Sequence, residues 1–174
     1  PGEAEVSAID FALKMIAKYN LNGKLCHIST KRGVEMIRAA KIHGANVTAE
    51  AAPHHMFFDA SMFTEKNHNL LQINPPIRSR EDRLAVIEGL RDGTLDYLAT
   101  DHAPHTKEEK LQGASGTPLL DTYGPFTSWL MTNHNFTPKD IARVCSYNPG
   151  NFINEFMGSP TSLGSGTSGH SPHL

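Results

Sequence analysis

The chain contains 174 residues, carries a formal net charge of -2 and has an apolar content ordinary for a globular protein. This length fits one domain with a sizeable core, and the balanced charge gives no electrostatic case for binding nucleic acid or an anionic membrane. No apolar run is long enough to span a bilayer, and Cys26 and Cys145 lack the spacing of metal ligands. We therefore expect a cytoplasmic protein with reduced thiols.

The two ends of the chain differ in character. Residues 1–20 are predicted to form a helix, because apolar residues recur on one helical face and because Glu3 and Glu5 suit the positive end of the helix dipole. This pattern begins at the first residue without an initiator methionine, so we expect a piece of a longer protein. Residues 158–174 are rich in Gly, Ser and Pro and are expected to be a disordered tail that follows a domain at 1–157.

Strand-like and helix-like segments alternate between these ends. Strands are expected at 24–29, 45–53, 69–76 and 94–100, the third of them weak because Pro75 and Pro76 interrupt it. Helices are expected at 30–44, 79–93, 122–134 and 137–148. This alternation is typical of an α/β protein in which helices connect parallel strands, and ligands bind such sheets at the carboxyl ends of the strands.

All four predicted strands end in side chains that can bind a ligand. The first ends at His27, the second runs into His54 and His55, and the third ends at Asn74. The fourth ends at Asp101, with His102 and His105 directly after it. Core packing does not explain four such ends on one rim, because a buried ionisable group needs a compensating partner. Imidazole nitrogens and carboxylate oxygens are ordinary zinc ligands, so the pattern indicates a catalytic zinc site.

Three stretches resemble the class I dihydroorotases of the amidohydrolase superfamily. They are LCHISTKRGVEMIRAAK, VTAEAAPHHMFF and INPPIRSREDRLAVIEGLRDGTLDYLATDHAPHTKEEK. The resemblance runs from about residue 1 to residue 156. Its most specific part is the Asp-His-Ala-Pro-His string at 101–105, which differs in the related hydantoinases and allantoinases.

The resemblance implies a (β/α)8 TIM barrel with a binuclear zinc site. The family reversibly hydrolyses dihydroorotate to N-carbamoyl-aspartate in pyrimidine biosynthesis. By motif, His27 and His54 would bind one zinc, and Asp101 would bind the other and act as the general base. The substrate would be held by Asn74, by His105 near its carboxylate and by the backbone near Gly116. The partners implied are this small molecule and either further copies of the chain or other pyrimidine-pathway enzymes.

Several family features are absent from the sequence. It lacks the His-x-His zinc pair, the arginine that follows this pair, and the bridging lysine carboxylate or aspartate of a middle strand. We therefore interpret the chain as the second half of a barrel, about strands 5 to 8 with their helices. The loop after His105 also differs, with Asp121 in place of the usual glutamate and without the usual second glycine.

The remaining polar residues have simpler interpretations. His55 and His102 are expected to support neighbouring groups, and Arg78, Arg80 and the charged run 107–110 are expected at the surface. Phe126 and Trp129 are expected in the core. The alternative function is a non-catalytic dihydroorotase-like scaffold. Inactive relatives tend to lose zinc ligands, whereas every ligand expected in this half is present, which favours the enzyme.

Overall fold

A computed structural model describes residues 2–157 of the chain, so the predicted tail at 158–174 lies outside the described residues. The fold is α/β, with a three-stranded parallel sheet whose spatial order follows the sequence: β1 (Gly23–Leu25), β2 (Val47–Ala51) and β3 (Tyr97–Leu98). The pairing continues past the short strands, because the Ile28 amide donates to the Glu50 carbonyl at 3.0 Å and the Ala99 amide donates to the Ala51 carbonyl at 3.0 Å.

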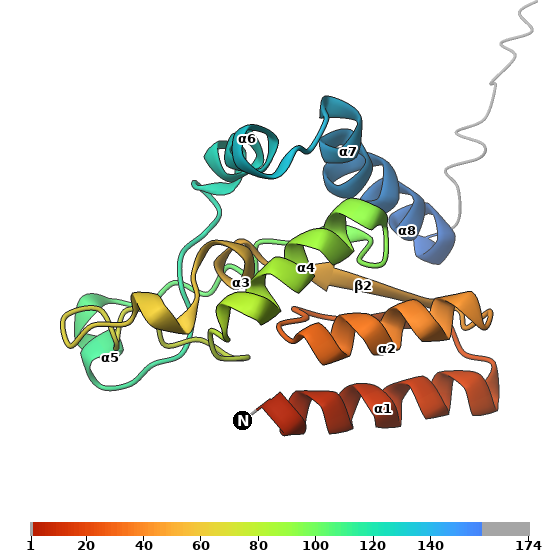
Figure 1. The fold of residues 1–174 in the computed structure, drawn as a ribbon, viewed down its shortest axis with the longest axis horizontal. Coiled ribbons are helices and arrows are strands. Elements are labelled where there is room, and N and C mark those ends of the chain that lie inside the picture. Colours follow the sequence, from red (N-terminus) through yellow and green to blue (C-terminus); the bar gives the residue numbers. More distant parts are fainter. Residues whose placement is uncertain (1, 158–174) are drawn as a thin grey trace, which may run out of the picture.

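Helices connect and flank these strands (Figure 1). The long ones are α1 (Gly2–Tyr19), α2 (Lys31–Ile42), α4 (Arg80–Asp92), α6 (Tyr123–His134) and α8 (Asn148–Met157). Shorter ones are α3 (Pro53–Phe57), a 3-10 turn (Ala60–Met62), α5 (Lys107–Leu111), α7 (Pro138–Ala142) and a π-helical turn (Arg143–Tyr147). Between residues 2 and 157, no helix combines the length and the apolar character needed to cross a membrane.

The core lies between the sheet and the layer of helices that Figure 1 shows stacked as α1, α2 and α4. Ala49 and Ala51 are fully buried on the face of β2 that joins this core, and their small side chains allow the helices to approach closely. Glu50 points to the opposite face, as the alternation of a strand requires, and pairs with Lys24 of β1. The apolar core therefore covers one face of the sheet, and the other face carries an ion pair.

The helix at 79–93 forms as predicted. The Ser79 hydroxyl accepts from the Asp82 amide at 3.1 Å, and the Asp82 carboxylate accepts in return from the Ser79 amide at 3.3 Å. Gly93 ends the helix with a left-handed backbone, φ 87°. The Asp82 carboxylate also accepts from the Lys31 amide at 2.8 Å and so links the start of α4 to the start of α2.

The strand predicted at 69–76 was wrong. Residues 64–72 form local turns instead, in which the His68 amide donates to the Thr64 carbonyl at 3.0 Å and the Leu71 amide to the Asn67 carbonyl at 3.0 Å. Pro75 and Pro76 have no backbone N–H, so this segment lacks two of the donors that would pair with a neighbouring strand. β2 pairs directly with β3, and the described sheet has three strands rather than the expected four.

Two glycines in helices give a matched test of how closely α2 and α4 pack. A Cβ on Gly89 would lie 2.8 Å from Val34 Cγ1, whereas a Cβ on Gly124 would meet nothing within 4 Å. We expect Gly89→Ala to lower the free energy of unfolding by about 1–3 kcal/mol through overpacking. Gly124→Ala should raise it by up to about 1 kcal/mol, because alanine favours a helix. Chemical denaturation of both variants checks this, and a stabilised Gly89→Ala variant would contradict the packing described.

Candidate active site at the strand ends

Three candidate residues lie just beyond the carboxyl ends of the three strands. His27 follows β1 by two residues, His54 follows β2 by three, and Asp101 follows β3 by three. Because the strands are parallel and adjacent, these ends share one edge of the sheet. Three of the four residues predicted at strand ends therefore follow adjacent strands at one edge of the sheet, while Asn74 lies in a turn.

His54 and Asp101 approach each other most closely. His54 Nε2 lies 3.6 Å from Asp101 Oδ2, a distance too long for a good hydrogen bond but within reach of a shared ligand. The His54 side chain is 2% exposed, and that of Asp101 is 33% exposed. Burial, and then the nearby His55 and His27 rings, lower the pKa of His54 to about 2. His54 is therefore a neutral imidazole at neutral pH, the form that binds metals.

Buried imidazole nitrogens at this edge lack hydrogen-bond partners. Within residues 2–157 they are Nδ1 of His27, both ring nitrogens of His54 and Nδ1 of His55. Buried polar atoms in proteins are nearly always satisfied, so a group of orphaned nitrogens beside a carboxylate needs an explanation. A divalent metal ion is one, because neutral imidazole and carboxylate are both zinc ligands.

The backbone at two of these residues is strained. His27 has φ 41° and Asp101 has φ 47°, in the left-handed region that residues other than glycine seldom occupy. Such conformations cost on the order of 1–3 kcal/mol each and concentrate at functional sites. Both residues stand just after the end of a strand, where the chain leaves the sheet.

The described residues do not complete a metal site by themselves. Between residues 2 and 157, no three His, Cys, Asp or Glu side chains converge closely enough to hold a metal ion. The donor chemistry of His27, His54 and Asp101 fits zinc, but their positions provide an incomplete set. This agrees with the absence of a His-x-His pair from the sequence.

A cleft of about 550 Å³ connects His27 with Asn74. Its wall is formed by α1, by the segment after β1 and by the Asn74-Pro75-Pro76 turn, and it includes Glu5 and Arg78. Asn74 is exposed, and the peptide bond to Pro75 is cis. His55 lies behind this turn, where its Nε2 donates to the Pro75 carbonyl at 2.8 Å. His55 thus supports the turn, as the sequence predicted for it.

His105 and Gly116 lie together in the loop that follows Asp101. His105 Nε2 lies 3.1 Å from the Ser115 carbonyl, and both backbone polar groups of Gly116 already have partners. The Gly116 amide donates to the Gln72 carbonyl at 3.0 Å, and its carbonyl accepts from Lys110 Nζ at 2.8 Å. A Cβ at Gly116 would lie 2.7 Å from the Ala103 carbonyl oxygen, so only glycine fits here.

Two polar residues in this region have structural roles. His102 Nδ1 accepts hydrogen bonds from the Leu119 and Leu120 amides, each at 3.1 Å, so His102 supports the loop. The prediction that 107–110 is a solvated loop was wrong, because these residues belong to α5 and Lys110 is 6% exposed. Its ammonium donates to the carbonyls of Gln72, Ala114 and Gly116 at 2.7–2.9 Å. Arg78 also departs from expectation, because it is largely buried and pairs with Glu5.

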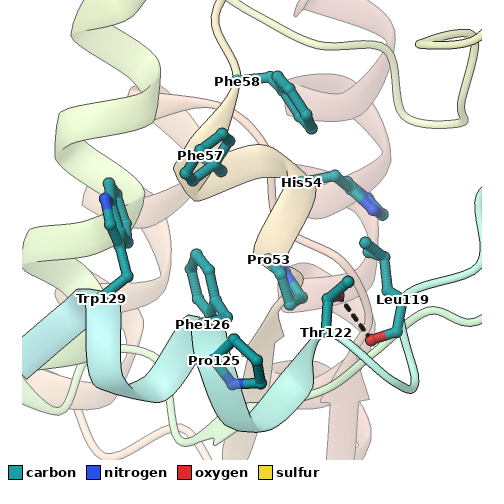
Figure 2. Close-up of a pocket in the computed structure, with 9 residues that line it drawn as sticks. All are labelled: Pro53, His54, Phe57, Phe58, Leu119, Thr122, Pro125, Phe126 and Trp129. Carbon is teal, nitrogen blue, oxygen red and sulfur yellow. Dashed lines mark hydrogen bonds between the residues drawn. The ribbon is translucent and has the colours of Figure 1, made fainter.

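An apolar cavity of about 260 Å³ lies beside His54, between α3 and α6 (Figure 2). Phe57, Phe126 and Trp129 line it, with Phe126 and Trp129 stacked at 5.3 Å between ring centroids. Figure 2 shows the His54 ring directed away from these aromatic side chains. Phe126 belongs to the core and Trp129 packs against it, as predicted.

Curated relatives of this chain include dihydroorotases. The chain is 41% identical over 137 residues to a dihydroorotase of Lactobacillus delbrueckii subsp. bulgaricus, which covers 79% of this chain and 32% of the relative. It is 37% identical over 155 residues to a dihydroorotase of Brevibacillus brevis, which covers 86% of this chain and 36% of the relative. The chain thus spans about a third of the length of these relatives. No family model matches it.

Solved structures with a similar fold include hydantoinases and dihydropyrimidinases. An L-hydantoinase of Arthrobacter aurescens matches with a TM-score of 0.82 at 25% identity, covering 88% of this chain and 36% of the other. A dihydropyrimidinase of Brevibacillus agri matches with a TM-score of 0.79 at 18% identity, covering 92% and 36%, and supports the fold alone. Together these matches show that the chain resembles part of a dihydroorotase and has part of the fold of the amidohydrolase superfamily.

Proposed function

We propose that this chain supplies part of the active site of a zinc-dependent dihydroorotase, within a partial TIM barrel at residues 1–157. The reaction is the reversible hydrolysis of dihydroorotate to N-carbamoyl-aspartate. One observation carries the proposal: His27, His54 and Asp101 follow adjacent parallel strands at one edge of the sheet, where orphaned imidazole nitrogens lie beside a carboxylate. The identity to curated dihydroorotases supports this substrate.

The residues divide into two groups by role. His27, His54 and Asp101 would supply zinc ligands, and the bound zinc would polarise the amide carbonyl and lower the pKa of water. Asp101 accepts the proton of the attacking water and returns it to the leaving ring nitrogen. The Asp101 carboxylate is partly exposed, so both the attacking water and the leaving ring nitrogen can reach it.

Asn74, His105 and the region of Gly116 bind the substrate. Asn74 is exposed on the cleft that His27 also lines, so its amide can reach a ligand placed beside the metal edge. His105 is exposed and lies near the Glu109 carboxylate, with 3.6 Å between Nδ1 and Oε2. His105 would contact the carboxylate of dihydroorotate, the role that the resemblance to dihydroorotases implies for it.

The substrate is tested by supplying the rest of the site. This chain is co-expressed with the part of the Lactobacillus delbrueckii dihydroorotase that the match leaves uncovered, and zinc is added. We expect hydrolysis of dihydroorotate in clear preference to a hydantoin. Preference for the hydantoin would assign the site to the reaction named for the similar solved structures. Turnover of neither compound would contradict the enzyme proposal and favour a scaffold.

The chain alone should bind zinc weakly, and it should hold fewer zinc ions than the two of a binuclear site. The three proposed ligands can hold at most about one zinc ion per chain, since protein zinc sites use three or four protein ligands. Elemental analysis after chelator washing and zinc reloading measures this. The control is His68→Asn, which changes a histidine distant in sequence from the three strand ends. Two tightly held zinc ions per chain would show that further ligands exist.

A further inference from the structure

Glu5, in the first turns of α1, is a hydrogen-bond acceptor for the segment that follows His27. Its Oε1 accepts from the Ser29 amide at 3.0 Å, the Thr30 amide at 3.0 Å and the Thr30 hydroxyl at 2.9 Å. Its Oε2 accepts from the Ser29 hydroxyl. The Glu5 side chain is only 10% exposed, so these four donors compensate for lost hydration.

The same carboxylate reaches the turn that carries Asn74. Arg78 Nη2 lies 3.3 Å from Glu5 Oε2, and Arg78 Nε donates to the Ser29 hydroxyl at 3.0 Å. Arg78 stands four residues after Asn74, and Ser29 stands two residues after His27. One carboxylate of α1 therefore ties together two segments that are far apart in the sequence.

Both tied segments, and Glu5 and Arg78 themselves, line the 550 Å³ cleft. Burial opposes ionisation of Glu5, but the hydrogen bonds from Ser29 and Thr30 outweigh it, so its pKa is lowered. The hydrogen-bond network therefore stabilises the ionised form of Glu5.

Support of α2 alone does not explain this arrangement. The Thr30 hydroxyl caps α2 directly by accepting from the Gly33 amide at 3.1 Å, and Asp82 accepts from the Lys31 amide at 2.8 Å. The start of α2 therefore has two caps without Glu5. What Glu5 adds is the connection between the His27 segment and the Asn74 turn.

We propose that Glu5 is a positioning residue of the active site, which fixes His27 and Asn74 relative to each other through Ser29 and Arg78. The inference rests on the proposed function for its catalytic consequence. The connection between the His27 segment and the Asn74 turn rests on the hydrogen bonds alone. In this account α1 contributes to the substrate cleft as well as to the core.

The first test is hydrogen exchange on the free chain, which needs neither zinc nor substrate. Glu5→Gln keeps the shape of the side chain but places an amide donor against the Ser29 or Arg78 donors. Amide exchange should accelerate about tenfold at Ser29 and Thr30, whose amides donate to Glu5, and at Ala60, whose amide donates to the Arg78 carbonyl. The reason is that a hydrogen bond to a charged group contributes about 1.5–3 kcal/mol, and 1.4 kcal/mol is a factor of ten. Glu3→Gln, the same charge change at an exposed position of α1, should leave both segments unchanged.

Coupling between the two segments is then read from a double variant. Adding Arg78→Met to Glu5→Gln should accelerate exchange little beyond either single change, because both break the same connection. Faster exchange confined to α1 in Glu5→Gln, or additive effects of the two changes, would overturn the connection.

The second test uses the complemented, zinc-loaded enzyme. Glu5→Gln should raise KM for dihydroorotate about tenfold with a smaller effect on kcat, because displacement of Asn74 weakens substrate binding. An unchanged KM at a temperature where the variant is fully folded would reduce Glu5 to a structural residue and overturn the positioning role. Failure of the wild type to hydrolyse any cyclic amide would instead count against the proposed function, and the exchange experiment would still decide the connection.

Discussion

Asp101→Asn is expected to lower the rate of dihydroorotate hydrolysis by about a hundred- to ten-thousand-fold, the usual contribution of general acid–base catalysis. The amide cannot accept the proton of the attacking water or return one to the leaving nitrogen. Asparagine suits this position structurally, because it tolerates the left-handed backbone at φ 47° better than most residues. The measurement is steady-state turnover by the complemented chain, with zinc content determined in parallel.

A matched variant separates catalysis from substrate binding. His105→Ala removes a side chain that is exposed beside the site but does not belong to the proposed metal set. It should lower kcat/KM while zinc content stays that of the wild type. If Asp101→Asn kept most of the activity with zinc bound, Asp101 would be a metal-holding residue, and the base would lie elsewhere.

The largest stability effect is expected for Lys110→Met. Methionine keeps an apolar stem but removes the ammonium that serves the carbonyls of Gln72, Ala114 and Gly116. Since a hydrogen bond to a charged group contributes about 1.5–3 kcal/mol, we expect a loss of about 3 kcal/mol or more in the free energy of unfolding. Urea denaturation measures this loss, and hydrogen exchange at 113–118 shows whether it is local to the loop.

Lys107→Met is the control for this change. Lys107 begins the same short helix but is exposed, so its loss should alter stability by less than about 0.5 kcal/mol. Equal denaturation midpoints for the two variants would mean that Lys110 does not hold the loop.

The local elements of the fold could be predicted from local sequence signals. The helix at 79–93 has a capping residue, a matching carboxylate three positions later and a terminal glycine, and each acts within a few residues. Thr137 and Pro138 mark the start of α7 in the same way, although the helical path then continues through the π-helical turn into α8, beyond the predicted end at 148. The strand prediction for 69–76 was wrong because it relied on the apolar residues of this segment. Its two prolines and local hydrogen bonds favour a turn instead.

The candidate site could be predicted only where residues follow strands directly. His27, His54 and Asp101 were identifiable because parallel strands bring their carboxyl ends to one edge. The Glu5 network could not be, since its donors are 24, 25 and 73 positions away in the chain. The burial of Lys110 was missed for a related reason. Its ammonium donates to backbone carbonyls, which every residue carries, so the sequence does not reveal these acceptors.

We propose that one edge of the sheet binds zinc through His27, His54 and Asp101. The test is X-ray absorption at the zinc edge of the zinc-loaded chain, in wild type and in His27→Asn, His54→Asn and Asp101→Asn. We expect histidine nitrogen and carboxylate oxygen ligands at about 2.0–2.2 Å in the wild type, with a changed ligand shell or weaker binding in each variant. A wild-type spectrum that all three variants reproduce at full zinc content would contradict it.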